Sequence, residues 1–169
     1  FKTYKTNIMG TVELMEVCKK LKTLKHVIVF TSDKVYENLP GKLLTENSKL
    51  GGIDPYSASK SSQDIITNSY KKSFFKKNKH FSIIRAGNII GGGDWNSSRL
   101  IPDIYNSIYM KKKLIIRNPN AIRPWQHVLD VVDAMIKLIL KKRKKINSDT
   151  EIYNVGPNLK SNIKVIDLL

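Results

Sequence analysis

Tyr56 and Lys60 have the residue types and the spacing of a proton-transferring pair. Residues four positions apart lie on the same side of an α-helix. Asp54-Pro55 is a typical helix start, because Asp favours the N-cap and Pro the first helical position. A lysine ammonium beside a phenol favours the phenolate, which is a usable base near neutral pH. Taken alone, this spacing more often means a surface tyrosine stacked on a lysine stem. The catalytic interpretation therefore depends on the neighbouring segments of the sequence.

Two predicted strands end in polar segments that could face such a pair. Residues 31–34 (Thr-Ser-Asp-Lys) follow the apolar run Val27–Phe30, and residues 87–88 (Gly-Asn) follow Phe81–Arg85. In an open parallel α/β sheet, ligands bind outside the carboxyl ends of the strands. Ser32 is therefore placed to hydrogen-bond the same substrate hydroxyl as the tyrosine.

The wider pattern alternates helices and strands. In chain order, hydrophobic periodicity predicts a helix at Asn7–Cys18, a strand at Val27–Phe30, a helix from Pro55 to Phe74, a strand at Phe81–Arg85, a helix at Ile101–Met110, a strand at Leu114–Arg117, a helix at Asp130–Leu140 and a strand at Glu151–Val155. This alternation predicts an α/β layer structure with parallel strands.

The charge of the chain is strongly basic. Its 169 residues include 30 Lys and Arg and 14 Asp and Glu, a formal net charge of +16, and 41% of them are hydrophobic, enough for a buried core in one domain or part of a larger one. Basic clusters at 71–79, 111–113 and 141–145 follow predicted helices, where cations stabilise the helix dipole. Lysine outnumbers arginine 25 to 5, whereas nucleic-acid readout favours arginine. We predict no nucleic-acid partner; a non-catalytic basic binding module stays as the alternative from another class.

The single cysteine and the short apolar runs bear on the location of the protein and on whether it binds a metal or a membrane. Cys18 has no second cysteine with which to form a disulfide or share a zinc site, which favours a reducing, cytoplasmic location and no metal. The longest apolar runs, such as Val27–Phe30, are far shorter than the roughly 18 residues that a membrane span requires. We predict a cytoplasmic protein with no membrane segment.

Several segments resemble the extended short-chain dehydrogenase/reductase superfamily of nucleotide-sugar epimerases and dehydratases. They are Thr31–Tyr36, Pro55–Lys60 and Arg85–Asn88, and further segments at Leu50–Tyr56, Arg85–Trp95, Arg99–Asp103 and Ile116–Val128 resemble its 4,6-dehydratases. The resemblance runs from about Asn7 to Pro157. It implies an α/β fold with part of a Rossmann-like doubly wound parallel sheet and part of a smaller substrate-binding lobe. Residues 1–90 would be the C-terminal half of the NAD-binding domain, and residues 91–169 mostly the lobe, with segments that return to the sheet.

The resemblance also implies roles for the polar residues. Tyr56 would take the proton from the sugar C4 hydroxyl as hydride passes to NAD. Lys60 would bind the nicotinamide ribose, Ser32 would hydrogen-bond O4, and Asp33 would be the acid for the departing C6 hydroxyl. Epimerisation at C4 alone needs no acid for C6, so the Asp33-Lys34 pair favours a dehydratase, and an epimerase stays as the alternative within the family.

Lys34 departs from the pattern of related dehydratases, in which the next residue is a glutamate base for the C5 proton. A lysine is cationic near neutral pH. We therefore expect Lys34 to stabilise an enolate electrostatically rather than to accept the proton.

Binding residues follow from the same resemblance. Asn88 would contact the substrate beside its phosphates, and Arg123, with Arg117 as a less certain companion, would bind the diphosphate, whose geometry suits guanidinium groups. Leu100 and Ile101 would pack around the nucleotide base, and Asn7 would lie beside the cofactor near the active site. Two of these residues also have a structural alternative: Asn88 would stabilise a turn, and Arg123 would be a packed surface residue. The implied assembly is a homodimer that packs through the Tyr56 helix and the Asn7 helix.

The family's glycine-rich NAD-binding motif is not found in these 169 residues. The chain also starts at Phe1 and stops at Leu169 within an apolar pattern. We therefore expect an internal piece of a longer protein, with the motif preceding Phe1, and an isolated chain that is marginally folded and inactive.

Overall fold

The structure is a computed structural model that describes residues 1–37, 42–75, 79–96, 99–141, 149–158 and 162–169. The chain divides into two compact units. The first comprises residues 1–86 and 137–155, and the second comprises residues 87–136 and 156–169.

A parallel sheet forms the centre of the first unit. Strands β1 (His26–Ser32), β2 (His80–Ala86) and β6 (Glu151–Val155) lie in the order β1-β2-β6, and both pairs of neighbours are parallel. The β-branched run of β1 alternates between buried and partly buried positions, and six of the seven residues of β2 are buried. Ser32 is paired with Ala86 at the carboxyl ends of β1 and β2. The predicted α/β fold with parallel strands is confirmed.

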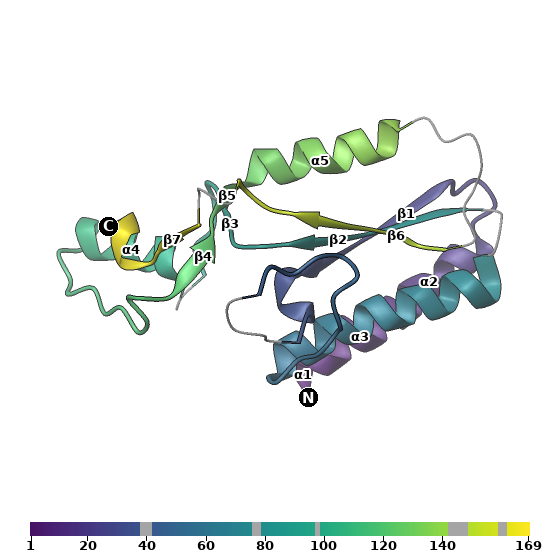
Figure 1. Ribbon diagram of the computed structural model, residues 1–169, viewed down its shortest axis with the longest axis horizontal. Coiled ribbons are helices and arrows are strands. Elements are labelled where there is room, and N and C mark those ends of the chain that lie inside the picture. The colour runs from purple at the N-terminus through teal and green to yellow at the C-terminus, as the bar shows by residue number, and fades with distance from the viewer. Residues whose placement is uncertain (38–41, 76–78, 97–98, 142–148, 159–161) are drawn as a thin grey trace. The chain divides into compact units, whose positions relative to one another are not determined.

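Two long helices lie side by side along one face of this sheet (Figure 1). The first begins as α1 (Lys2–Tyr4), passes through the π-helical turn η1 (Lys5–Met9) and continues as α2 (Gly10–Lys20). The second, α3 (Pro55–Tyr70), ends in the π-helical turn η3 (Lys71–Phe75). A short 3₁₀ turn, η2 (Asp33–Val35), follows β1 directly.

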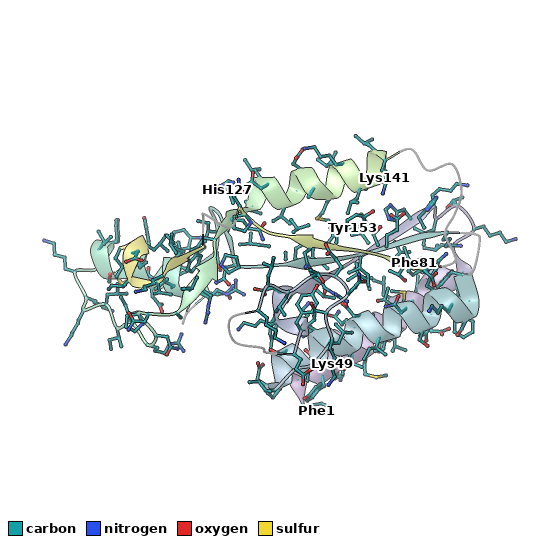
Figure 2. All side chains as sticks on the ribbon, in the orientation of Figure 1. Phe1, Lys49, Phe81, His127, Lys141 and Tyr153 are labelled. Atoms are coloured by element: carbon teal, nitrogen blue, oxygen red, sulfur yellow. The ribbon has the colours of Figure 1, made fainter. Side chains whose placement is uncertain are left out.

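The hydrophobic core of the first unit lies between the helices and the sheet. Its buried members are Met15, Cys18, Val27, Val29, Phe75, Phe81 and Ile83, of which Phe81 is labelled in Figure 2. The Phe75 and Phe81 rings pack with their centroids 4.9 Å apart. Farther along the sheet, Lys141 Nζ donates to the hydroxyl of Tyr153 on β6 at 2.9 Å.

The second unit contains short strands and helix α4. Parallel strands β3 (Ile89–Ile90) and β5 (Gln126–His127) form one pair, and antiparallel strands β4 (Ile122–Pro124) and β7 (Asn162–Lys164) form another. Helix α4 spans Leu100–Tyr109, α5 spans Val128–Leu140, and the 3₁₀ turn η5 spans Ile166–Leu168.

Two predictions of secondary structure differ from the structure. The prediction of a strand at Leu114–Arg117 is wrong. This stretch is irregular, because none of the described strands pairs with it. Helix α5 begins at Val128, two residues before the predicted cap at Asp130. The strand predicted at Glu151–Val155 is confirmed as β6.

Candidate active site

The start of α3 is fixed by a side-chain cap and a close loop contact. Asp54 Oδ1 accepts hydrogen bonds from the backbone N–H groups of Tyr56 and Ser57 at 2.9 and 3.0 Å, and Ser57 Oγ donates to Asp54 Oδ2. Gly52 has a φ of +131°, and a Cβ there would come within 2.5 Å of the backbone of Ala58. Only glycine allows the loop to approach the first turn of α3 this closely, so the backbone at Tyr56 is held from two sides.

We expect Asp54→Ala to lower the free energy of unfolding by about 1 kcal/mol, because it removes this cap. Hydrogen bonds from Ser57, above all from its hydroxyl, lower the pKa of Asp54. A lowered folded-state pKa contributes stability above the unfolded-state pKa, and that stability is lost as the pH falls through the folded-state pKa. The difference between variant and wild type should therefore shrink in acid when urea unfolding is measured. Asp54→Asn retains a capping oxygen, so its free energy of unfolding should fall less than that of Asp54→Ala. An equal decrease in the two variants would contradict a capping role.

Tyr56 and Lys60 point to the same side of α3 near the carboxyl end of β1. Lys60 is partly buried, and its Nζ donates to Phe30 O on β1 at 3.3 Å. Burial lowers the pKa of Lys60, and the carboxylate of Asp64 opposes this. The Tyr56 side chain is 43% exposed, and its hydroxyl has no hydrogen-bond partner among the described residues. That hydroxyl is therefore open to a ligand, beside a half-buried cation.

Ser32, Asp33 and Lys34 follow at the end of β1. Ser32 is buried, its hydroxyl donates to Asp33 Oδ1 at 2.9 Å, and the backbone N–H of Lys34 donates to Ser32 Oγ at 3.2 Å. The ammonium of Lys34, which is exposed, lies 6.0 Å from the centroid of the Tyr56 ring. The last residue of β1 and the turn η2 thus bring a hydroxyl, a carboxylate and an ammonium to the same end of the sheet as the tyrosine.

Asn7 lies in the π-helical turn η1 and contacts α3. Its Nδ2 donates to Ser59 Oγ at 2.9 Å, and its backbone carbonyl accepts from Thr11 Oγ1 at 2.7 Å. Turns of this kind occur often at functional sites. The structure therefore places Asn7 against the helix that carries Tyr56 and Lys60, and its predicted position beside a cofactor stays a prediction.

The other predicted binding residues lie in the second unit, which is described by itself. The backbone carbonyl of Asn88 accepts from the N–H of Gln126 at 3.0 Å. Leu100 and Ile101 form the first turn of α4, and Arg117 is exposed in the irregular segment that precedes β4. Arg123 is the central residue of β4, and its Nη1 donates to Ile122 O at 2.9 Å.

A buried ion pair behind the site was not among the predicted residues. Arg85 Nε and Nη2 both bond Asp64 Oδ2, with Nε at 2.6 Å, and both side chains are almost fully buried. Arg85 Nη1 also donates to the hydroxyl of Tyr36 at 2.9 Å and to Glu46 O at 3.0 Å. One signal was present in the sequence: Tyr56, Lys60 and Asp64 are spaced by four residues, so they share one side of α3.

The donors at the end of β1 fit the ribose of a dinucleotide. One of the three N–H groups of the Lys60 ammonium donates to Phe30 O. Its other two N–H groups and the Tyr56 hydroxyl are the groups that would bond the hydroxyls of such a ribose. Among the described residues, no cluster of His, Cys, Asp and Glu could hold a metal ion, and no helix there is long and apolar enough to cross a membrane.

A parallel α/β sheet with a tyrosine–lysine pair at the start of an adjacent helix is typical of dinucleotide-binding enzymes. The family model described as NAD dependent epimerase/dehydratase family matches residues 1–156, so the chain belongs to this family. NAD is accordingly the cofactor, as predicted.

The resemblance to 4,6-dehydratases is confirmed, and the segments Arg85–Trp95 and Ile116–Val128 resemble one of these enzymes in particular, CDP-glucose 4,6-dehydratase. The chain is 41% identical over 162 residues to CDP-glucose 4,6-dehydratase of Salmonella typhimurium, covering 92% of this chain and 45% of the relative. It is 33% identical over 172 residues to dTDP-D-glucose 4,6-dehydratase of Dictyostelium discoideum, covering 94% of this chain and 37% of the relative. The chain thus spans about half the length, or less, of these curated relatives.

Solved structures show the same fold. The dTDP-glucose 4,6-dehydratase of Bacillus anthracis in complex with NAD superposes with a TM-score of 0.82 at 30% identity, covering 98% of this chain and 50% of that chain. A UDP-glucuronic acid 4-epimerase from Bacillus cereus superposes with a TM-score of 0.83 at 22% identity, covering 97% of this chain and 49% of that chain. The epimerase supports the fold alone.

Proposed function

We propose that this chain is about half of an NAD-dependent enzyme that converts CDP-glucose to CDP-4-dehydro-6-deoxyglucose. The carrying observation is the open Tyr56 hydroxyl beside the half-buried Lys60, with Ser32 and Asp33 at the same end of β1. The 41% identity to a CDP-glucose 4,6-dehydratase supports the choice of substrate. The wider class, a nucleotide-sugar dehydratase or epimerase, rests on the family match.

The first step is oxidation of the sugar at C4. Tyr56 removes the proton of the C4 hydroxyl, Lys60 favours the phenolate that does this, and the Ser32 hydroxyl orients the sugar oxygen. Bound NAD would supply the acceptor for the hydride from C4 and the donor of the hydride to C6, and Lys60 would hold its ribose. Because Lys60 Nζ donates to Phe30 O, its ammonium is held against β1 before substrate binds.

The second step removes water across C5 and C6. The C4 ketone acidifies C5, whose proton passes to solvent, and Asp33 gives a proton to the departing C6 hydroxyl, so that one water leaves and a C5–C6 double bond forms. Hydride then adds to C6 and a proton returns to C5, so the product is oxidised at C4, reduced at C6 and one water lighter than the substrate, with no net redox change. The 2.9 Å hydrogen bond from the Ser32 hydroxyl to Asp33 Oδ1 supports these two roles, because it keeps the two side chains together.

We expect Lys34→Met to slow loss of water by about tenfold to a hundredfold and to leave C4 oxidation largely intact, because enolate charge develops only after oxidation. Lys34 lies close to the Tyr56 ring, so its charge is available at the reacting sugar. Single-turnover absorbance of the reduced nicotinamide should show that it accumulates. Lys49→Met provides the control, since Lys49 is an exposed lysine paired with Glu37. Full dehydration by Lys34→Met would remove this lysine from the mechanism.

The substrate is tested with the whole protein that carries this chain. It is incubated with CDP-glucose, and the 4-keto-6-deoxy product is followed by its absorbance in alkali. We expect product from CDP-glucose and much less from dTDP-, UDP- or GDP-glucose. If only another nucleotide sugar were turned over, the proposed substrate would be wrong and the proposed reaction would stand. Interconversion of C4 epimers without loss of water would replace the dehydratase with an epimerase, the second candidate.

We also propose that the whole protein is a homodimer that packs through α2 and α3. These helices expose Leu14, Val17 and Ile65, each more than half exposed, on a surface where solvated polar residues would otherwise be expected. Sedimentation of the whole protein as a monomer would contradict this assembly.

A further inference from the structure

We propose that Asp64 is a positioning residue for the reaction, and that the buried Asp64–Arg85 pair holds Lys60 in its ammonium form. This inference rests on the proposed function, because it concerns how the tyrosine–lysine pair is kept active. It arises from three features: the place of Asp64 on α3, the way Arg85 binds it, and an oxygen that Arg85 leaves open.

Asp64 lies one helical turn after Lys60, as Lys60 lies one turn after Tyr56. The three side chains therefore follow one another along one side of α3, from the exposed Tyr56 to the partly buried Lys60 and the fully buried Asp64. A carboxylate inside the protein acts on a nearby ammonium more strongly than one in water, because solvent screens it less. Burial disfavours a charged lysine, so Lys60 needs such an anion to stay protonated.

The geometry of the ion pair leaves Asp64 able to act on Lys60. Both bonds from Arg85 go to Oδ2. Oδ1 is buried and is not bonded by Arg85, while the Thr31 hydroxyl also stabilises the Asp64 carboxylate. Arginine–carboxylate pairs frequently engage both oxygens in a parallel fork. Here Arg85 leaves Oδ1 to other groups, and Lys60 is the next cation along the helix.

The other charged groups around α3 do not replace Asp64. Asp64, on α3 itself, is the charged side chain that acts on the pKa of Lys60. The titratable groups on the elements that pack against α3 are Lys2, Tyr4, Lys5, Glu13, Glu16, Cys18, Lys19, Lys20, His26, Asp33, Lys34, Lys71 and Lys72, with Arg85 on β2 beyond Asp64. Asp64 raises that pKa, whereas burial lowers it. Loss of the pair therefore shifts Lys60 toward the neutral amine.

The test replaces both members of the pair at once, since a single replacement leaves a buried charge without its partner. Asp64→Leu with Arg85→Met exchanges the pair for apolar side chains, a change that proteins often tolerate without loss of stability. Asp64→Asn with Arg85→Gln is the second variant, which removes the charges and keeps polar groups, and it carries the test if the first does not fold. Glu16→Gln is the matched control, because it removes a carboxylate that binds Lys19 and Tyr70 instead.

Two readouts separate positioning from structure. In the whole protein, competitive labelling with acetic anhydride over a neutral-to-alkaline pH series, with the Lys60 peptide quantified by mass spectrometry, gives the pH at which Lys60 loses its proton. We expect that pH to fall by about one unit in the double variant and to stay unchanged in Glu16→Gln. The alkaline limb of the turnover profile should move down with it, giving about tenfold lower turnover on that limb and unchanged turnover well below it.

Each outcome decides between the possibilities. An unchanged labelling profile in a folded double variant overturns the inference, as does a shifted labelling profile with an unchanged turnover profile. Labelling requires no substrate, so a wild-type protein that turns over no nucleotide sugar would defeat the proposed function, whereas the labelling shift would still report the ionic link between Asp64 and Lys60.

Discussion

Replacement of Tyr56 by Phe is expected to lower turnover of the nucleotide sugar by about a thousandfold and to leave the fold intact. General acid–base catalysis contributes about a hundredfold to ten-thousandfold to a reaction rate, and the phenol is the base for the C4 hydroxyl in the proposed mechanism. The hydroxyl makes no hydrogen bond within the described residues and the ring is 43% exposed, so its loss leaves no buried polar group unpaired. Turnover of CDP-glucose and thermal unfolding, measured on the same samples, test both parts.

Tyr4→Phe is the matched control for this variant. Tyr4 is exposed to nearly the same extent, 40%, and lies in α1, outside the end of β1 where the polar residues gather. It should retain full turnover. If Tyr56→Phe retained more than about a tenth of wild-type turnover, the tyrosine would not be the base. A lower melting temperature for Tyr56→Phe would instead show that the hydroxyl has a structural partner.

The sequence was sufficient to predict the elements whose pattern is local. The strands β1, β2 and β6 are β-branched or apolar runs of five to seven residues, and α3 has both a capping Asp and a first-turn Pro. The two-residue strands β3 and β5 were not predicted, because their pairing depends on segments about 37 residues apart rather than on their own composition. The opposite error occurred at Leu114–Arg117, where an apolar run lacks a partner strand and forms none.

The candidate site was predicted where single residues follow a strand or a helix start. Ser32 and Tyr56 are of this kind, and the structure brings both to the carboxyl end of β1. The Asp64–Arg85 pair could not be predicted in the same way, because its members are 21 residues apart on a helix and a strand. Their contact follows from how α3 packs on the sheet. Only the four-residue spacing from Lys60 to Asp64 was visible beforehand.

The largest effect on stability is expected for Arg85→Met, which should lower the free energy of unfolding by about 3–5 kcal/mol at neutral pH. Removing one member of a buried ion pair leaves the other charge in a medium that solvates it poorly. Arg85 is 3% exposed. Its replacement also removes the hydrogen bonds that its guanidinium donates to Tyr36 Oη and Glu46 O, and these bonds join β2 to the segments that follow β1. Urea unfolding followed by circular dichroism gives the free energy directly.

The pH dependence of this loss identifies its cause. Burial raises the pKa of Asp64, and the Arg85 guanidinium opposes this. A carboxyl whose folded-state pKa is raised favours the folded protein below its unfolded-state pKa, and that contribution is lost as the pH rises through the folded-state pKa. Without Arg85 the folded-state pKa rises further, so the variant should recover toward wild type as the pH falls and Asp64 takes up a proton. Arg99→Met is the control, because its 3.2 Å bond to Asp94 lies at the surface, where solvent screens an ion pair and its loss changes stability little. A loss for Arg85→Met that stays constant from neutral to acid pH would mean that packing, and not the unpaired carboxylate, sets the stability of this part of the fold.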